Sequence, residues 1–346
     1  MKLSDIGEFG FIDRIAPLGL IRPAKVIRGI GDDCAVVRID EDTCLLVTTD
    51  LLIERVHFYR SWGSANILGR KSLAVNISDI AACGGVPKDA FVSIGIPEDV
   101  EVEWLDDFYD GLAGLAREYG VNILGGDTTR SLADIVINVA ITGVAGCNET
   151  LFRDTAKPGN ILALTGPTGL SAAGCDLLLR GEAPPGHWVE TLKAAHLNPR
   201  PHVKEGRFLA ASHACTAAID ISDGLSSDLN HICTQSNVGA LIFEDKLPIH
   251  DALLEAASYL GRDPLEWLLH GGEDYALLAC LRPDAFPAVK ASAAERGLQL
   301  IAIGVIEETP GMRLQRGDGH VEALTGGGWN HFRGRNGKFG GIEIRP

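Results

Sequence analysis

The stretch from residue 72 to residue 87 constrains the fold most, because a helical pattern there carries a single carboxylate. We expect a helix over residues 64–83, since Ser64 is a good N-cap and two glycines at 84 and 85 end it. At 3.6 residues per turn, a polar stripe and an apolar stripe lie side by side on this helix. The polar stripe contains Ser72, Asn76, Asp79 and Cys83, and the apolar stripe contains Leu73, Ile77 and Ile80. The apolar stripe can face a core, and a buried Asp79 then needs a positive partner.

Asp79 is one of five places where aspartate lies beside glycine or a hydroxyl side chain at the break of a predicted element. They are Gly31-Asp32-Asp33, Thr48-Thr49-Asp50, Asp79, Gly125-Gly126-Asp127-Thr128 and Asp220-Ile221-Ser222-Asp223-Gly224. In open α/β sheets ligands bind at the carboxyl ends of strands, where this interpretation places Asp50, Asp127 and Asp220. Converging carboxylates repel one another, and hard cations such as Mg²⁺ relieve the repulsion and often bind substrate phosphates as well. The sequence therefore predicts a magnesium site that holds a nucleotide.

Helix capping and the common nucleotide-binding loops account for these residues less well. Each acid could cap a helix, as Asp223 could for a helix over 225–235, but capping does not explain all five places. Residues 69–72 read Gly-Arg-Lys-Ser, yet the spacing fails that of a Walker P-loop. Gly29 and Gly31 begin like a dinucleotide fingerprint, but acids follow where phosphate would approach. A non-catalytic module that binds divalent metal stays open as an alternative.

Length and charge limit the class of protein. A chain of 346 residues suggests two domains, and 46% hydrophobic residues suffice for two cores. The net charge of −15 without basic clusters argues against nucleic acid and anionic membranes as partners. The eight cysteines are scattered and form no Cys-x-x-Cys, so we expect reduced, buried cysteines in a cytosolic protein rather than disulfides or a zinc site. Without a signal-peptide pattern or a long apolar run, we expect a cytoplasmic location.

The expected elements alternate between strands and helices, which predicts an α/β fold with two domains, residues 1–147 and 148–346. A polar joint over 146–160 separates the domains, and residues 333–346 are expected to be a loose tail. Expected helices cover residues 7–20, 64–83, 102–119, 171–179 and 225–235, with an amphipathic stretch near 187–213. Expected strands cover residues 43–50, 90–96, 121–124, 135–144, 161–165 and 217–221, and a glycine turn followed by a strand spans 271–280.

With these motifs in place, the chain resembles thiamine-monophosphate kinase from about residue 7 to residue 332. The motifs that carry the resemblance are Gly-Glu-Phe (7–9), Gly-Ile-Gly-Asp-Asp-Cys-Ala (29–35), Thr-Thr-Asp…His-Phe (48–58), Ala-Val-Asn-Ile-Ser-Asp-Ile-Ala-Ala (74–82), Gly-Gly-Asp-Thr-Thr-Arg (125–130), Ala-Lys-Pro-Gly (156–159), Ile-Asp-Ile-Ser-Asp-Gly-Leu (219–225) and Gly-Gly-Glu-Asp-Tyr (271–275). The wider superfamily includes aminoimidazole ribonucleotide synthetase and selenophosphate synthetase. The resemblance implies a homodimer of two-domain subunits, with N-terminal and C-terminal domains like those of aminoimidazole ribonucleotide synthetase. It also implies phosphorylation of thiamine monophosphate by ATP with several Mg²⁺ ions.

The resemblance also implies roles for individual residues. The implied Mg²⁺ ligands are Asp33, Thr48, Thr49, Asp50, Asp79, Asp127, Asp220 and Asp223, of which Asp50, Asp79, Asp127 and Asp223 are the candidate catalytic residues. The implied ATP-binding residues are Tyr109, Gly126, Asp127, Arg153 and Ser222. The implied residues for thiamine monophosphate are His57, Glu273 and Trp329, since a carboxylate and an indole face suit a flat cationic ring.

Each role has a plainer alternative in the sequence itself. His57 could be a core histidine, Arg153 a surface arginine of the linker, and Glu273 the partner of a nearby cation. Trp329 could simply cover the C-terminal core, and it stands where the family often has tyrosine or phenylalanine. Another ATP-dependent reaction of the superfamily would keep the acids and change the pocket.

Overall fold

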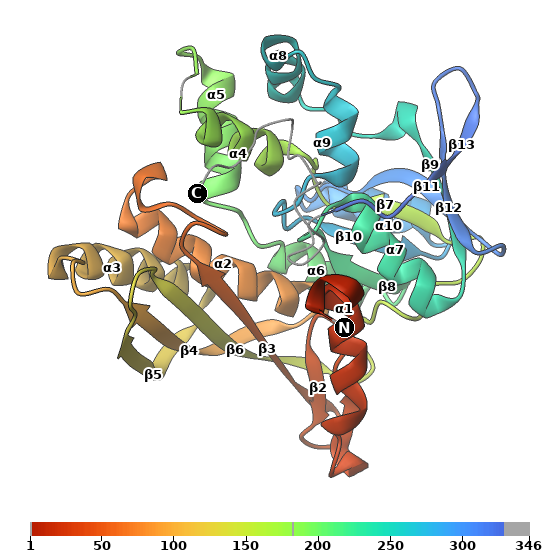
Figure 1. Cartoon of the computed structure of the whole chain (residues 1–346). Helices are drawn as coiled ribbons and strands as arrows, with labels where there is room; N and C mark the ends of the chain where they lie inside the picture. Colours follow the sequence, from red (N-terminus) through yellow and green to blue (C-terminus); the bar gives the residue numbers. More distant parts are fainter. Residues whose placement is uncertain (1, 182, 329–346) are drawn as a thin grey trace.

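The computed structural model describes residues 2–181 and 183–328, which form two sheets with helices packed against them (Figure 1). The first sheet has six strands in the order β1-β2-β3-β6-β4-β5. Its strands are β1 (Val26–Arg28), β2 (Ala35–Arg38), β3 (Thr43–Ile53), β4 (Val86–Ile96), β5 (Asn122–Arg130) and β6 (Val136–Gly146). Only the β4–β5 pair among them is parallel.

Helices α2 (Ala65–Ala82) and α3 (Val102–Tyr119) cover one face of this sheet, which we call the inner face. Strand alternation sends Val92 and Val139 into the core under the helices. The opposite, outer face carries exposed apolar side chains. They include Leu51, Phe91 and Leu124. Both helices match the ranges expected from the periodicity and caps to within one residue.

The second sheet has seven strands in the order β13-β12-β9-β11-β7-β10-β8. Its strands are β7 (Ile161–Leu164), β8 (Cys215–Asp220), β9 (Gly239–Phe243), β10 (Leu277–Leu281), β11 (Ile301–Glu307), β12 (Gly311–Gln315) and β13 (Val321–Leu324). Two apolar clusters use opposite faces of this sheet, so it is buried between two layers of helices. One layer contains α4 (Leu170–Arg180), α5 (His187–Leu197), α7 (Leu225–Ser236), α8 (Asp251–Leu260) and α9 (Pro264–His270). The other contains α6 (Val203–Ala211) and α10 (Phe286–Glu295).

Helix α2 is the element on which the two halves meet. Its residues Leu73, Ile77 and Ile80 join the core of the first sheet, as the apolar stripe predicts. Its end reaches the second half, where Ala82 packs in a cluster with Leu209 of α6 and Ala218 of β8. One helix therefore contributes to two cores.

The N-terminal helix α1 (Leu3–Ile15) bends at Gly7 and lies near the second sheet. The ring of Phe9 contacts the ring of His231 on α7, with 4.6 Å between their centroids. Helix α1 therefore contacts α7, which packs on the second sheet. The predicted joint over 146–160 is mostly turns and irregular chain.

Two expectations about the chain are wrong. Strand β5 does not end before Gly125 but continues through Gly125, Gly126 and Asp127, and Asp50 lies inside β3 rather than at its end. Backbone pairing with β4 carries β5 through the glycines, since ladder hydrogen bonds need no side chain.

The expectation that all cysteines are reduced is also contradicted. Cys44 and Cys147 form a disulfide, with 5.3 Å between their Cα atoms. The pairing of β3 with β6 sets Cys44 opposite Ala145, two residues before Cys147. The two cysteines lie 103 residues apart in the chain, so only the strand register brings them together.

Trp329 and the predicted tail 333–346 lie outside the described residues. Within 2–181 and 183–328, no helix combines the length and the apolarity needed to cross a membrane.

The contact between α2 and α3 depends on glycine and gives a first prediction. A Cβ at Gly111 of α3 would lie 1.8 Å from the carbonyl oxygen of Asn66, whereas one at Gly114 would meet only the flexible end of Arg70, at 3.7 Å. We expect Gly111→Ala to lower the free energy of unfolding by about 1–3 kcal/mol, because the helices must separate. Gly114→Ala is the matched control and should be neutral or stabilising by up to about 1 kcal/mol. Chemical denaturation of both variants tests this, and equal stabilities would contradict it.

Candidate active site

Four carboxylates from four elements meet at the inner face of the first sheet. Asp33 precedes β2, Asp50 lies in β3, Asp79 lies in α2, and Asp220 ends β8 of the other half. Carboxylate oxygens of Asp33, Asp79 and Asp220 lie within 4.8 Å of one another. Asp50 is close enough to act electrostatically on Asp79 and Asp220. We call these four residues the acid cluster.

Short hydrogen bonds from α2 and β3 fix the acid cluster. Thr48 donates its hydroxyl to Asp79 Oδ2 at 2.5 Å, and Ser78 donates to Asp220 Oδ2 at 2.5 Å. Asn76 accepts a hydrogen bond from the backbone N–H of Asp50 at 3.0 Å. The polar stripe of α2 therefore faces β3, and Ser78, on the next stripe, faces β8.

The acid cluster is electrostatically unfavourable without a cation. Burial, with further contributions from neighbouring carboxylates, raises the pKa of Asp33 to about 7 and of Asp50 and Asp220 to about 6. Burial and the charges of Asp50, Asp220 and Asp33 raise the pKa of Asp79 well above its ordinary value. Each raised pKa means that the ionised carboxylate is destabilised where it lies.

Arg153 is the positive group beside the acid cluster. Its guanidinium pairs with Asp33 and lies 3.4 Å from Asp32 Oδ1. Burial opposes the charge of Arg153, but Asp33 and Asp32 raise its pKa above the ordinary value. The alternative that Arg153 is a surface arginine is therefore wrong, since its side chain is 14% exposed.

The donor set of the acid cluster fits a hard divalent cation. Asp33 Oδ2 is buried and has no hydrogen-bond partner among the described residues. Carboxylate oxygens with space for water are the ligands that Mg²⁺ prefers. Asp33, Asp79 and Asp220 would hold the ion.

Asp223 and Ser222 lie next to the acid cluster, in the turn between β8 and α7. Burial and the charge of Glu8 on α1 raise the pKa of Asp223 to about 7, although Arg153 acts in the opposite direction. An oxygen of Asp223 lies within 4.8 Å of ligand atoms of Asp228 and His231. Asp228 accepts hydrogen bonds from the backbone N–H groups of Asp223 and Gly224, so it shapes this turn.

Two predicted metal ligands lie on the other side of the sheet. Asp127 pairs with Ser93 in the ladder, Ser93 with Asn138, and Asn138 with Leu51, so these side chains share the outer face. The hydroxyl of Thr49 accepts a hydrogen bond from Asn138 on that face, at 2.8 Å. Strand pairing therefore separates Thr49 and Asp127 from the acid cluster.

The two remaining predicted nucleotide-binding residues also lie apart from the acid cluster. Gly126 is exposed on β5, where a Cβ would lie 1.7 Å from the carbonyl oxygen of Val92, so only glycine fits there. Tyr109 is 36% exposed on α3, where its ring contacts Phe108.

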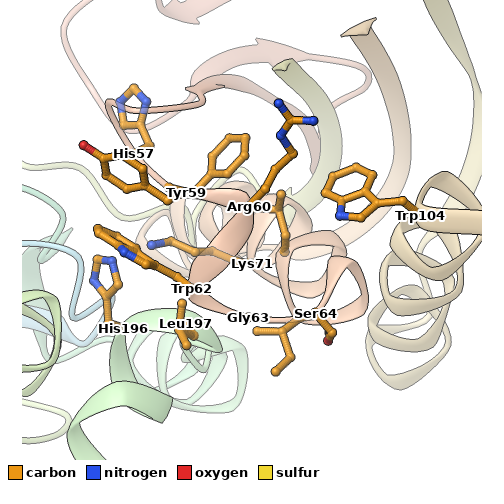
Figure 2. Close-up of a pocket in the computed structure, with 13 residues that line it drawn as sticks. His57, Tyr59, Arg60, Trp62, Gly63, Ser64, Lys71, Trp104, His196 and Leu197 are labelled. Carbon is orange, nitrogen blue, oxygen red and sulfur yellow. Dashed lines mark hydrogen bonds between the residues drawn. The ribbon is translucent and has the colours of Figure 1, made fainter. Parts of the chain in front are cut away.

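A pocket with aromatic walls lies at the other end of α2 (Figure 2). It encloses about 360 Å³ including its open mouth. Its lining includes His57, Tyr59, Trp62, Trp104, Lys71 and His196. The Trp62 ring contacts Tyr59 at 4.7 Å and His196 at 5.6 Å between centroids. His57 accepts a hydrogen bond from the backbone N–H of Ile53 at 2.9 Å.

Glu273 lies beside this pocket with Lys71 and His196. Lys71 Nζ is 3.0 Å and His196 Nδ1 is 3.1 Å from the same oxygen, Glu273 Oε2. The sequence allowed a cationic partner for Glu273 but did not identify it. Lys71 offered a signal, a lysine two residues before the apolar stripe of a buried helix, but its partner is 202 residues away.

The raised pKa values predict how stability depends on pH and metal. A carboxyl whose pKa is raised in the fold stabilises it at low pH, and this contribution is lost as pH rises through the folded pKa. With a chelator present, we therefore expect Tm to fall as the pH rises from 6 to 8, because the carboxyls of the acid cluster ionise. Added Mg²⁺ should raise Tm more at pH 8 than at pH 6. The control Asp50→Asn should show a smaller loss in chelator. Tm values in chelator that fall equally in both proteins would contradict the prediction.

Comparisons with known proteins identify the family of this chain. Residues 31–145 match the family model "AIR synthase related protein, N-terminal domain", and residues 157–317 match the corresponding C-terminal domain. Thiamine-monophosphate kinase of Bacillus subtilis (strain 168) is 36% identical over 94% of this chain and 99% of its own length. The Aquifex aeolicus (strain VF5) enzyme of the same name is 33% identical over 96% of this chain and all of its own length.

A solved structure described as "AaThiL complexed with AMPPCP and TMP" superimposes with a TM-score of 0.85. It is 34% identical and covers 96% of this chain and 99% of its own. The sequence and the fold of this chain thus match those of these relatives over nearly the whole length. The chain therefore belongs to the thiamine-monophosphate kinase family, within the AIR synthase related proteins.

Proposed function

We propose that this protein transfers the γ-phosphoryl group of ATP to thiamine monophosphate, giving thiamine diphosphate and ADP in thiamine diphosphate biosynthesis. One observation carries the proposal: helix α2 contributes Asp79 to the acid cluster and Lys71 to the aromatic pocket. The carboxylate of Glu273 lies beside that pocket. The similar structure described as "AaThiL complexed with AMPPCP and TMP" supports the same pair of substrates.

The residues of the site suit direct in-line transfer. A phosphate monoester with a second pKa of about 6 is largely ionised at pH 7, so the acceptor needs no general base. The reaction requires alignment and charge neutralisation, because two polyanions must meet. Mg²⁺ ions held by the acid cluster would neutralise charge on the phosphates. Asp50, Asp79 and Asp223 would act by holding the Mg²⁺ ions in position. Thr48 orients Asp79, and Ser78 orients Asp220.

The pocket suits a flat cationic ring. His57, Tyr59 and Trp62 supply aromatic faces, and Glu273 supplies a negative charge at its side. Burial acts to raise the pKa of Glu273, but Lys71 and then His196 lower it below the ordinary value, which keeps the carboxylate ionised. Trp329, the third predicted contact of the acceptor, lies outside the described residues.

The nucleotide would lie near Arg153 and Ser222 at the boundary between the two halves. Arg153 already pairs with Asp33, so binding of a metal to Asp33 would free the guanidinium to contact a phosphate. Tyr109 lies on α3, and Gly126 and Asp127 lie on β5, apart from the acid cluster. Any contact that they make with the nucleotide would therefore be away from the metal ions.

We also propose a homodimer formed through the outer face of the first sheet. Leu51 is 48%, Phe91 41% and Leu124 59% exposed there, and a second copy would bury them. Thr49 and Asp127 would then lie at the interface. Because the reaction consumes ATP, we propose a cytoplasmic location.

A substitution in the acid cluster tests the function. With ATP, Mg²⁺ and thiamine monophosphate, we expect thiamine diphosphate and ADP in equal amounts, and neither with EDTA. Asp79→Asn should lower kcat by about 100-fold or more, as loss of a preorganised charge does. Its fold should persist, since the amide can still accept the hydrogen bond from Thr48.

The control for this experiment is Asp318→Asn in the turn between β12 and β13, which should keep wild-type turnover. ADP without thiamine diphosphate would instead support another ATP-dependent reaction of the superfamily. Absence of ADP with metal-dependent melting would support the non-catalytic metal module.

A further inference from the structure

Lys71 is a charged residue to which the proposed reaction gives no direct role. It lies on α2 and lines the aromatic pocket, and its side chain is only 2% exposed. A lysine buried to this extent is rare unless it has a partner. Its ammonium lies 3.0 Å from Oε2 of Glu273, which belongs to the other half of the molecule.

His196 of α5 lies beside the same carboxylate oxygen. Its Nδ1 lies 3.1 Å from Glu273 Oε2 and 3.0 Å from the hydroxyl of Ser171. Burial, and next the charge of Lys71, lower the pKa of His196 to about 3, so the ring is neutral.

The backbone of Glu273 is fixed as well. Its φ of +64° is in the left-handed region, which non-glycine residues adopt only where their surroundings impose it. Its N–H donates to the carbonyl oxygen of Ser222 at 2.7 Å. The next residue, Asp274, accepts a hydrogen bond from the N–H of Ser171 at 3.1 Å and so anchors the turn to the start of α4.

The two oxygens of Glu273 are therefore in different situations. Oε2 accepts a hydrogen bond from Lys71 and lies 3.1 Å from His196 Nδ1, whereas no hydrogen bond from the described residues reaches Oε1, and the side chain keeps 24% exposure. The carboxylate of Glu273 is therefore fixed through Oε2, and Oε1 is available to a ligand.

We propose that Lys71 and His196 are positioning residues that fix Glu273, so that its Oε1 meets the cationic ring of the acceptor. This inference rests on the proposed function and extends it to two residues of the pocket lining that act through Glu273. Because Lys71 belongs to α2 and Glu273 to the 271–275 turn, the acceptor contact forms only when the two halves are docked.

A double-variant cycle tests whether Lys71 acts through Glu273. Glu273→Gln and Lys71→Met should each raise KM for thiamine monophosphate by about tenfold or more, the scale of a hydrogen bond to a charged group. KM for ATP should stay within about twofold. The double variant should resemble Glu273→Gln alone, because two residues that act as a unit are not additive.

Two further variants complete the experiment. Lys71→Arg keeps the charge and should restore most of the affinity for the acceptor, which a purely structural role would not require. Arg70→Met removes the neighbouring ion pair with the exposed Glu118 and should change neither KM. Thermal unfolding of every variant identifies any that fails to fold, and the double variant and Lys71→Arg still decide the question in that case.

The possible failures are distinguishable. If KM for the acceptor rises in the double variant well beyond that of Glu273→Gln, Lys71 acts on the acceptor directly and the inference is wrong. If Lys71→Met changes KM for ATP and the acceptor equally, the role is structural and the inference is again wrong. If the wild-type protein forms no thiamine diphosphate, the proposed function fails and this inference fails with it.

Discussion

The repulsion among buried carboxylates is the constraint on which the rest of the structure depends. Burial raises the pKa values of Asp33, Asp50, Asp79 and Asp220, and the charges of neighbouring carboxylates raise them further. A fold can hold such a group only if the surrounding elements are rigid. Helix α2 supplies that rigidity, since its apolar stripe packs in one core and its end packs in another.

The same helix connects the two parts of the proposed reaction. Its first half carries Lys71 beside the aromatic pocket, and its second half carries Asp79 in the acid cluster. Eight residues of α-helix span about 12 Å, a distance suited to an acceptor whose ring and phosphate occupy different places. A rigid rod between pocket and metal site fixes their separation, and fixed geometry is a main source of rate in phosphoryl transfer.

The elements with clear periodicity could be predicted from the sequence, and the arrangement across the sheet could not. The caps and stripes of α2 and α3 are local features, so their ranges were predicted closely. The outer-face position of Asp127 depends on register, and a shift of one residue would place it on the inner face. The bond between Cys44 and Cys147 and the pair of Lys71 with Glu273 link distant parts of the chain, for which a single sequence holds no signal.

The acid cluster is assembled from both halves of the molecule, and this origin has a consequence for motion. Asp33, Asp50 and Asp79 belong to the first sheet and the helix that covers it, whereas Asp220 belongs to the second sheet. A cation bound among them would link the two halves, and its affinity would depend on the distance between the two sheets. Any hinge displacement that parts the sheets would dismantle the coordination shell, so release of the ion and opening of the molecule would be one event.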